Sequence, residues 1–460
     1  MTTTSCIMRG AGLIFNIYVA NRVGQEAIGV FSLVMSVYTF AITFATSGLG
    51  LACTCIVSEE FEKKNYTAGY MAVKTCIKFA IVLGLIGCLL LIALAPIIST
   101  FCLNNAVSNM PIYAISLGLP LISVSSVISG YFNSIGKSYK NAFSQSFELF
   151  VKIIVTIVLL CYAIDKSIDV ICTCLILGDV ISEIFSFTLN IVLYYIDRKK
   201  SLYRHSSNLK MANRIFKISF PVAITSYIRS GLSSLKQFLI PLRLQTSGLN
   251  YTIAISKYGL INGMVMPVLM FASFFISSFG SLLIPEYSRL LAGKNFNRIK
   301  TVSHKIFDTT FAFSILVSGI FLFFANELSL IIYQSLESAI YIRILAPLVI
   351  FMYIDTIIDS ILKGINSQFG AMCINICDLV MTIAIIYFVV PILGVNGYIF
   401  SICASEIFNF CASYFLLKKK IGCGFYILHY CFKPCLGLVI SYIISLMIPC
   451  IFDNFILRQF

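Results

Sequence analysis

Charged side chains are scarce in this sequence, and tryptophan is absent. Only 11% of its 460 residues are Asp, Glu, Lys or Arg, whereas 59% are hydrophobic. Soluble domains carry about 25% charged residues, so the composition excludes a soluble globular protein and predicts an integral membrane protein. Because tryptophan is lacking, the 24 tyrosines must supply most of any aromatic belt at the membrane surfaces.

Recognisable catalytic motifs are missing as well. The sequence has no phosphate-binding P-loop, no GxSxG nucleophile turn and no HExxH metal motif. Its 17 cysteines are scattered through apolar runs without CxxC pairs, which indicates small apolar filler rather than a metal centre. We therefore expect no enzymatic activity and no cofactor. Transport would draw on an ion gradient, with Na+ or H+ as coupling ion, on the membrane potential or on the substrate gradient.

Long apolar runs fill most of the chain. A membrane crossing needs about 20 apolar residues, and the first of the predicted helices is short, with no polar segment ahead of it. The predicted fold class is an all-α membrane protein with about 13 transmembrane helices. Their predicted ranges are 3–22, 27–56, 72–99, 111–132, 143–164, 168–196, 212–243, 253–283, 303–326, 338–363, 371–391, 395–417 and 426–451.

The links between these runs alternate in charge. Basic residues gather in one set of links, above all in the segment 197–217, whereas the other set holds only Arg22, Lys166, Lys257 and Arg458. Cytoplasmic loops carry the excess of lysine and arginine, so the basic set is expected to face the cytoplasm and its anionic lipids. The net charge of +14 therefore indicates membrane topology and not nucleic-acid binding. We expect a bacterial plasma-membrane protein with a cytoplasmic N-terminus.

An internal repeat is visible when the chain is aligned with itself without gaps. One constant offset aligns Gly29–Asn65 with Gly259–Asn295, and a further match pairs residues 133–136 with residues 366–370 at a slightly larger offset. Six helices separate the two copies, so both have the same orientation. This is a parallel repeat about an axis along the membrane normal, with a central cavity between the lobes.

The repeat and the basic segment together predict how the chain is divided. We expect two parallel six-helix lobes plus one extra C-terminal helix. The predicted boundaries are 1–196 for the N-terminal lobe, 197–217 for a basic cytoplasmic linker, 212–417 for the C-terminal lobe, and 424–460 for the extra helix and tail.

The helix predicted at 212–243 carries Arg229, Lys236 and Arg243 at equal intervals of seven positions. This interval is about two helical turns, so the three side chains project from nearly one side. An arginine in the middle of a membrane costs at least about 2.5 kcal/mol, so it should face a cavity or an acid. One interpretation is a cationic stripe for an anionic head group. The alternative is that Arg243 and Lys236 extend to the outer surface.

Acidic residues inside the predicted helices are candidates for ion coupling. Asp179 and Glu183 stand one helical turn apart, a spacing at which two carboxylates repel unless a proton or a cation intervenes. Asp355 has no local cation, whereas Asp359 can pair with Lys363. We expect Glu148 and Lys152 to pair with each other. Asp378 and Glu406 are single acids inside predicted helices.

The segment Arg9–Ser58, RGAGLIFNIYVANRVGQEAIGVFSLVMSVYTFAITFATSGLGLACTCIVS, resembles the opening of the polysaccharide-exporter branch of the multidrug/oligosaccharidyl-lipid/polysaccharide (MOP) flippase superfamily, and within it the stage V sporulation protein B group. Residues 130–153 and 391–410 resemble the same group. The resemblance implies two six-helix lobes around a V-shaped cavity and alternating access. In related lipid II flippases, helix 1 arginines serve the cavity; Arg9 matches the first, and the next position falls on Asn16.

Three functions remain open from the sequence. The leading hypothesis is a monomeric flippase that moves a lipid-linked anionic oligosaccharide or peptidoglycan precursor, held by Arg9, Asn16, Arg229, Lys236 and Arg243. The second is a cation-coupled multidrug antiporter of the same fold, for which an acid-lined cavity would be expected. The third is a non-transporting membrane scaffold in envelope or spore assembly, and the three-cation stripe speaks against it.

Overall fold

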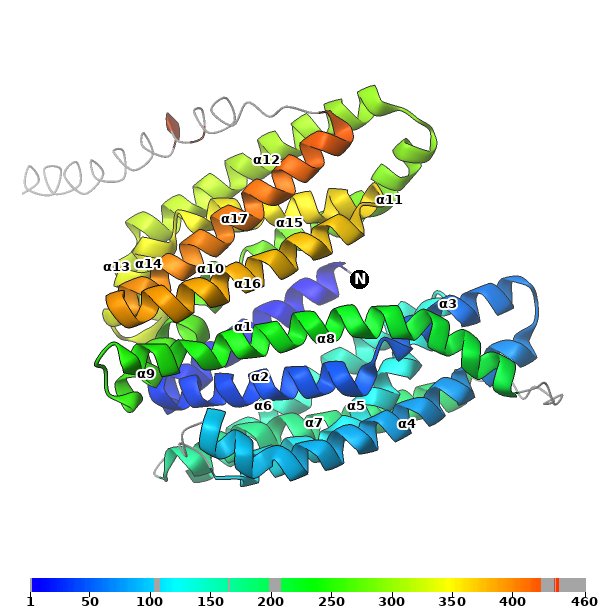
Figure 1. The fold of residues 1–460 in the computed structure, drawn as a ribbon, viewed down its shortest axis with the longest axis horizontal. Coiled ribbons are helices and arrows are strands. Elements are labelled where there is room, and N and C mark those ends of the chain that lie inside the picture. Colours follow the sequence, from blue (N-terminus) through cyan, green and yellow to red (C-terminus); the bar gives the residue numbers. More distant parts are fainter. Residues whose placement is uncertain are drawn as a thin grey trace, which may run out of the picture. The chain divides into compact units, whose positions relative to one another are not determined.

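The computed structural model describes residues 2–102, 108–163, 166–197 and 208–422, together with residues 434, 436 and 437. Throughout these residues the ordered elements are helices (Figure 1). Internal contacts divide the chain into two compact units, Met1–Gly263 and Met264–Phe460. The predicted all-α membrane fold is confirmed. The extra helix and tail predicted at 424–460 lie outside the described residues, apart from the three named above.

Unit 1 is a bundle of long helices. Its elements are α1 (Thr2–Val23), α2 (Gln25–Thr46), α3 (Leu49–Glu62), α4 (Tyr66–Ile97) with the π-helical turn η1 (Ile98–Cys102), α5 (Met110–Ser134), α6 (Ser138–Ala163), α7 (Ile168–Asp197), α8 (Asn208–Thr246), α9 (Tyr251–Tyr258) and the start of the π-helical turn η2 (Gly259–Val265). The helix pairs α4–α5, α6–α7 and α5–α7 make the most extensive contacts in this unit.

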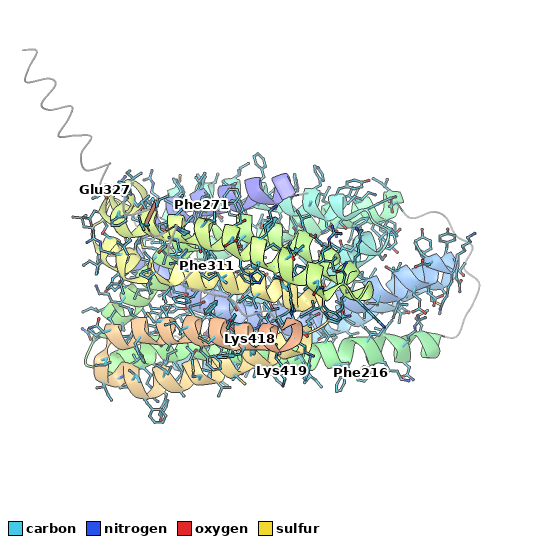
Figure 2. All side chains as sticks on the ribbon, turned by 90° about the horizontal axis from the view of Figure 1, so that it is seen from above. Phe216, Phe271, Phe311, Glu327, Lys418 and Lys419 are labelled. Carbon is cyan, nitrogen blue, oxygen red and sulfur yellow. The ribbon has the colours of Figure 1, made fainter. Side chains whose placement is uncertain are left out.

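Unit 2 contains the remaining helices. They are α10 (Met266–Leu269), α11 (Ser273–Ala292), α12 (Phe296–Phe323), α13 (Ala325–Tyr333), α14 (Glu337–Leu345), α15 (Leu348–Gly364), α16 (Gln368–Leu393) and α17 (Val395–Ile421). Figure 2 shows Lys418 and Lys419 at the end of α17, at the other end of this unit from Glu327 in α13. This separation matches the predicted alternation of basic and cation-poor links.

The predicted positions of the first twelve helices are confirmed, but three of these helices are broken. The helix predicted at 27–56 ends at Thr46 and restarts at Leu49, because Ser47 and Gly48 both adopt the left-handed conformation. The helix predicted at 253–283 is interrupted at 270–272, between α10 and α11.

The third break carries a proline. The helix predicted at 338–363 bends by 53° between α14 and α15, and Pro347 stands at the bend. Proline removes a helical hydrogen bond and clashes with the preceding turn. The bend therefore follows from the local sequence.

The predicted total of thirteen spans is not confirmed. In the described part of the chain, nine helices are long and apolar enough to cross a membrane, or ten if the bent pair α14 and α15 counts as one span. Helix α8 is not among them although it has 39 residues. Its serines, threonines and cations make it too polar for a wholly lipid-facing helix, so part of its surface needs a polar environment.

The two copies of the internal repeat share a hydrogen bond from a serine side chain to a backbone carbonyl. Ser58 donates from Oγ to the carbonyl of Ser134 at 3.4 Å, and Ser288 donates to the carbonyl of Gly364 at 3.0 Å. The second pair is equivalent to the first at the same offset that aligns Gly29 with Gly259.

The predicted match of residues 133–136 with residues 366–370 was wrong. Both Gly136 and Asn366 are turn residues with positive φ, at 71° and 57°. They align with each other at the offset of the main repeat, so no change of register occurs between the two matches.

The compact units and the predicted lobes have different boundaries. The prediction placed a boundary at the basic linker 197–217, whereas internal contacts place it at Gly263. Residues 198–207 of this linker lie outside the described residues. Helices α8 and α9 belong to unit 1 because both pack against α2. The predicted lobes describe the repeat in the sequence, and they stay a prediction about the functional halves.

Candidate functional site

Helix α8 presents a polar face that includes Arg229 and Lys236. Thr225 and Ser233 lie one turn to either side of Arg229 on the same face. The Arg229 side chain is exposed and Lys236 is half-buried. Among the described residues, neither cation has a hydrogen-bond or ion-pair partner, whereas Arg243 is held by an interaction. Two cations without protein partners on a membrane helix are suited to an anionic ligand.

The other polar face of α8 is attached to α2. The hydroxyl of Tyr227 hydrogen-bonds with Ser47, which is the first residue of the α2–α3 break. Thr43 donates to Ser230 at 3.2 Å, and Ser234 donates to the carbonyl of Ser36 at 2.9 Å. These bonds fix the rotation of α8 about its axis, so the Arg229 face points away from α2. The helices run side by side in Figure 1.

An ion-pair network fixes the start of α8. Arg214 pairs with both Glu59 and Glu60 near the end of α3, and Lys63 pairs with Glu59 at 2.6 Å. A second cluster stands at the end of α7, where Lys140 pairs with Asp197 at 2.8 Å. Thus the cations of these predicted cytoplasmic ends are partly matched by acids, whereas Arg229 and Lys236 are not.

Lys137 also pairs with Asp197, the single acid of the predicted basic segment. Hydrogen bonding to this carboxylate raises the pKa of the Lys137 ammonium above its ordinary value. The group is therefore fully charged at neutral pH. The Tyr131 hydroxyl donates to the other oxygen of Asp197 at 3.3 Å.

The helix 1 candidates are only partly described. Arg9 lies in α1, but its side chain is outside the described set. Asn16 is exposed on the same helix. Near the end of α1, Arg22 stacks over the ring of Tyr18 with 5.8 Å between the guanidinium carbon and the ring centroid. The distance between the Arg9 and Arg229 side chains is therefore not described, and the joint role of these two residues stays a prediction.

Three acids of unit 1, Glu148, Asp179 and Glu183, gather between α6 and α7. Asp179 pairs with Lys152, and both side chains are largely buried. The predicted pairing of Lys152 with Glu148 was wrong, because the packing of α7 on α6 brings Asp179 to the ammonium group. Glu183 lies within electrostatic range of Glu148 and Asp179, and Tyr38 of α2 faces the group. Three carboxyl groups thus share one nearby cation.

Three candidate acids of unit 2, Asp355, Asp359 and Asp378, lie on α15 and α16. Asp359 pairs with Lys363, as their spacing of one helical turn predicted. In the described residues, Oδ1 of Asp355 is buried without a hydrogen-bond partner. The sequence pattern missed the setting of Asp378, whose carboxylate accepts a 2.7 Å hydrogen bond from Ser405 of α17. Within the described ranges, no group of His, Cys, Asp and Glu could hold a metal ion.

The described helices form a duplicated, largely apolar bundle, as expected for a multi-pass membrane transporter of the flippase and exporter type. The chain belongs to the polysaccharide biosynthesis protein family, whose model matches residues 1–291. The expected family resemblance is therefore confirmed.

Two curated relatives come from Bacillus subtilis (strain 168). Stage V sporulation protein B is 24% identical over 404 residues, which cover 85% of this chain and 77% of that protein. Lipid II flippase MurJ is 21% identical over 463 residues, which cover 93% of this chain and 83% of the relative. Both matches extend well beyond the family model, into unit 2.

Solved structures support the fold. A structure of lipid II flippase MurJ in an inward closed conformation has a TM-score of 0.70 at 14% identity and covers 96% of this chain and 92% of its own. An inward-facing multidrug resistance MATE family transporter of the MOP superfamily has a TM-score of 0.68 at 14% identity, with 92% and 95% covered. At this identity the likeness concerns the fold alone.

Proposed function

We propose that this protein moves a lipid-linked anionic glycan, such as a lipid-linked oligosaccharide or peptidoglycan precursor, across the bacterial plasma membrane by alternating access. The observation that carries the proposal is the face of α8 on which, within the described residues, Arg229 and Lys236 stand without protein partners. The family's link to polysaccharide biosynthesis and the relative named as a lipid II flippase support the cargo class.

The proposed head-group path begins on α1 and α8. Arg9 and Asn16 would contact the head group from α1, while Arg229 and Lys236 would contact it from α8, with Arg243 near the exit. Guanidinium groups bind phosphate oxygens through paired, charge-assisted hydrogen bonds. The lipid tail would stay in the bilayer, so the polar path need only accommodate the head group. The protein would act as a monomer with its N-terminus in the cytoplasm.

Reconstitution tests the role of Arg229. Proteoliposomes containing the wild type or Arg229→Gln are compared for movement of a labelled undecaprenyl-diphosphate-linked oligosaccharide. A hydrogen bond to a charged group is worth about 1.5–3 kcal/mol, so the variant should transport roughly 10- to 150-fold more slowly. Arg298→Gln is the matched control, because Arg298 is exposed at the start of α12. Equal rates for all three proteins would remove Arg229 from the mechanism.

Coupling is proposed to use Glu183 and Asp355, with Asp179 as a third candidate. Burial of Asp355 Oδ1 without a partner and the excess of carboxylates around Glu183 both favour uptake of a proton or a cation. Glu183→Gln and Asp355→Asn should make transport insensitive to an imposed Na+ or H+ gradient. Asp359→Asn is the control, since Asp359 already has Lys363 as its partner. A gradient dependence unchanged in both variants would exclude these two sites.

A further inference from the structure

The end of unit 2 at which α17 stops carries a group of lysines. Lys418, Lys419 and Lys420 lie in the last turn of α17, and all three are exposed; Figure 2 labels the first two. Lys300 of α12 lies beside them, since a Cβ atom added at Gly422, the residue that ends α17, would be 3.7 Å from the Lys300 Nζ. Four lysines from two helices thus meet at this end, and we call them the lysine cluster.

The protein offers little negative charge to balance the lysine cluster. Among the described residues, none of the four lysines has an ion-pair partner. The sequence that follows α17 adds no acid, because residues 423–452 contain neither Asp nor Glu. The negative end of the α17 dipole is equivalent to about half a charge, which is too little for four ammonium groups. Since like charges repel, the cluster is suited to an anion from outside the chain.

The first copy of the internal repeat differs at the equivalent helix end. Glu59 and Glu60 of α3 align with Arg289 and Leu290 of α11 at the offset of the main repeat. In unit 1 both glutamates pair with Arg214. In unit 2 an exposed arginine stands in place of the first glutamate. The acids that neutralise a cation in the first copy therefore have no counterpart in the second.

Exposed aromatic rings lie next to the lysine cluster. Phe415 of α17 is exposed one helical turn before Lys418, on the same face. Phe369, at the start of α16, is exposed as well, and the residue after it touches α17: a Cβ added at Gly370 would be 2.7 Å from Cδ2 of Leu416. Rings beside ammonium groups match the two parts of a phospholipid, its acyl chains and its charged head group. A small soluble anion would use the lysines alone.

We propose that the lysine cluster, with Phe369 and Phe415, binds an anionic phospholipid of the predicted cytoplasmic leaflet. The lysines bind the phosphodiester, and the two rings contact the acyl chains. Basic pockets between helices on the cytoplasmic side are suited to such head groups. The phospholipid is a bound component and not the cargo, because the cluster belongs to unit 2 and the proposed cargo face lies on α8 in unit 1. The proposal therefore goes beyond the proposed function and holds whichever cargo is transported.

Native mass spectrometry of the full-length protein in a neutral detergent measures this binding. The protein is titrated with phosphatidylglycerol, with phosphatidylcholine of the same acyl chains, which has no net charge, and with glycerol phosphate, which has the anionic head-group chemistry without chains. Phosphatidylglycerol should bind at least about fivefold more tightly than either of the other two. Equal affinity for the two lipids, or for phosphatidylglycerol and glycerol phosphate, would overturn the proposal.

Two triple variants of α17 separate charge from side-chain shape. Replacement of Lys418, Lys419 and Lys420 by glutamine should weaken binding of phosphatidylglycerol about 100-fold, because each lysine near an anionic head group contributes about fivefold in affinity. Replacement of the same three lysines by arginine keeps the charge and should change the affinity less than about threefold. Unaltered binding in the glutamine variant, or equal loss in the arginine variant, would contradict a charge-based site. Thermal unfolding verifies that both variants are folded.

A charge-matched variant of unit 1 provides the control. Replacement of Lys63, Lys64 and Lys137 by glutamine removes the same charge, but Lys63 and Lys137 already pair with acids. This variant should weaken phosphatidylglycerol binding less than about fivefold, and a loss as large as that of the α17 glutamine variant would overturn the proposal. Loss of binding in Arg229→Gln with full binding in the α17 glutamine variant would also overturn it. That result would place the lipid on α8 and would leave the proposed function intact.

Discussion

The turn between α3 and α4 and the turn between α11 and α12 are equivalent in the internal repeat and have the same backbone. Lys64 and Lys294 both adopt positive φ, at 58° and 50°. The side chains of Asn65 and Asn295 each accept a hydrogen bond at 3.3 Å from a backbone N–H in the first turn of the helix that follows. Only a few residue types can cap a helix in this way, so local chemistry has kept the two copies alike here.

The helices that lead into these turns are not alike. In the first copy, α2 breaks at Ser47 and Gly48, and Tyr227 bonds to the break. The equivalent residues of the second copy, 277 and 278, lie inside the continuous helix α11, and the break falls earlier, at 270–272. The positions of helix breaks therefore follow the tertiary partners that satisfy freed carbonyls. The turns are fixed locally, whereas these two breaks are fixed by their neighbours.

The largest effect is expected at Gly29, where α2 passes closest to the backbone of α9. Gly29→Val would force a branched side chain against the Ile255 carbonyl, and overpacking of this kind costs about 3 kcal/mol. Gly10→Val is the control, because a Cβ at Gly10 meets nothing within 4 Å. Thermal unfolding in detergent should show a clearly lower Tm for Gly29→Val alone. Equal Tm values for Gly29→Val and Gly10→Val would mean that α2 and α9 are not tightly packed at Gly29.

The stability of the protein should fall by different amounts when the tyrosine hydroxyl is removed from the α2–α3 break and from the break at 270–272. Tyr353→Phe leaves the Leu269 carbonyl unpaired in a fully buried position and should cost about 1–3 kcal/mol. Tyr227→Phe should cost about 1 kcal/mol or less, because Tyr227 is only half-buried and Ser47 also bonds to the Phe44 carbonyl. Unfolding of each variant by denaturant measures the two costs. A larger cost for Tyr227→Phe than for Tyr353→Phe would contradict this account of how the two breaks are stabilised.

Removal of the asparagine caps should have the smallest effect on stability, and the effect should be the same in both turns. Asn65→Ala and Asn295→Ala each remove one cap, which costs about 1 kcal/mol. The two unfolding midpoints should fall by similar amounts, since the cap geometry is the same in both turns. A loss in only one of the variants would show that the two turns are not equivalent in solution.

Much of the fold could be predicted because apolar runs and charge alternation are local properties. The twelve helix positions between residues 3 and 417 follow from hydropathy alone. The breaks at Ser47, at 270–272 and at Pro347 could not be predicted in this way, because hydropathy does not report backbone conformation. The gapless alignment of the chain with itself found the repeat, but the turn at 133–136 was placed wrongly because short polar matches occur by chance.

The candidate site was predictable to the extent that it lies on one helix. The regular spacing of Arg229, Lys236 and Arg243 identified the cationic face of α8. The partner of Lys152 was not predictable, because the sequence shows only neighbours on the same helix, such as Glu148, and not Asp179 on the next one. For the same reason the bond between Ser405 and Asp378 could not be foreseen.

The central claim is that the Arg229–Lys236 face of α8 lines the path of an anionic head group. A photo-reactive residue at Ser233, between these cations, is compared with one at Leu235, which is exposed on another side of the helix. In membranes supplied with a lipid-linked oligosaccharide, position 233 is predicted to capture the glycan head group and position 235 the acyl chains of lipids. Capture of acyl chains alone at position 233 would contradict the account.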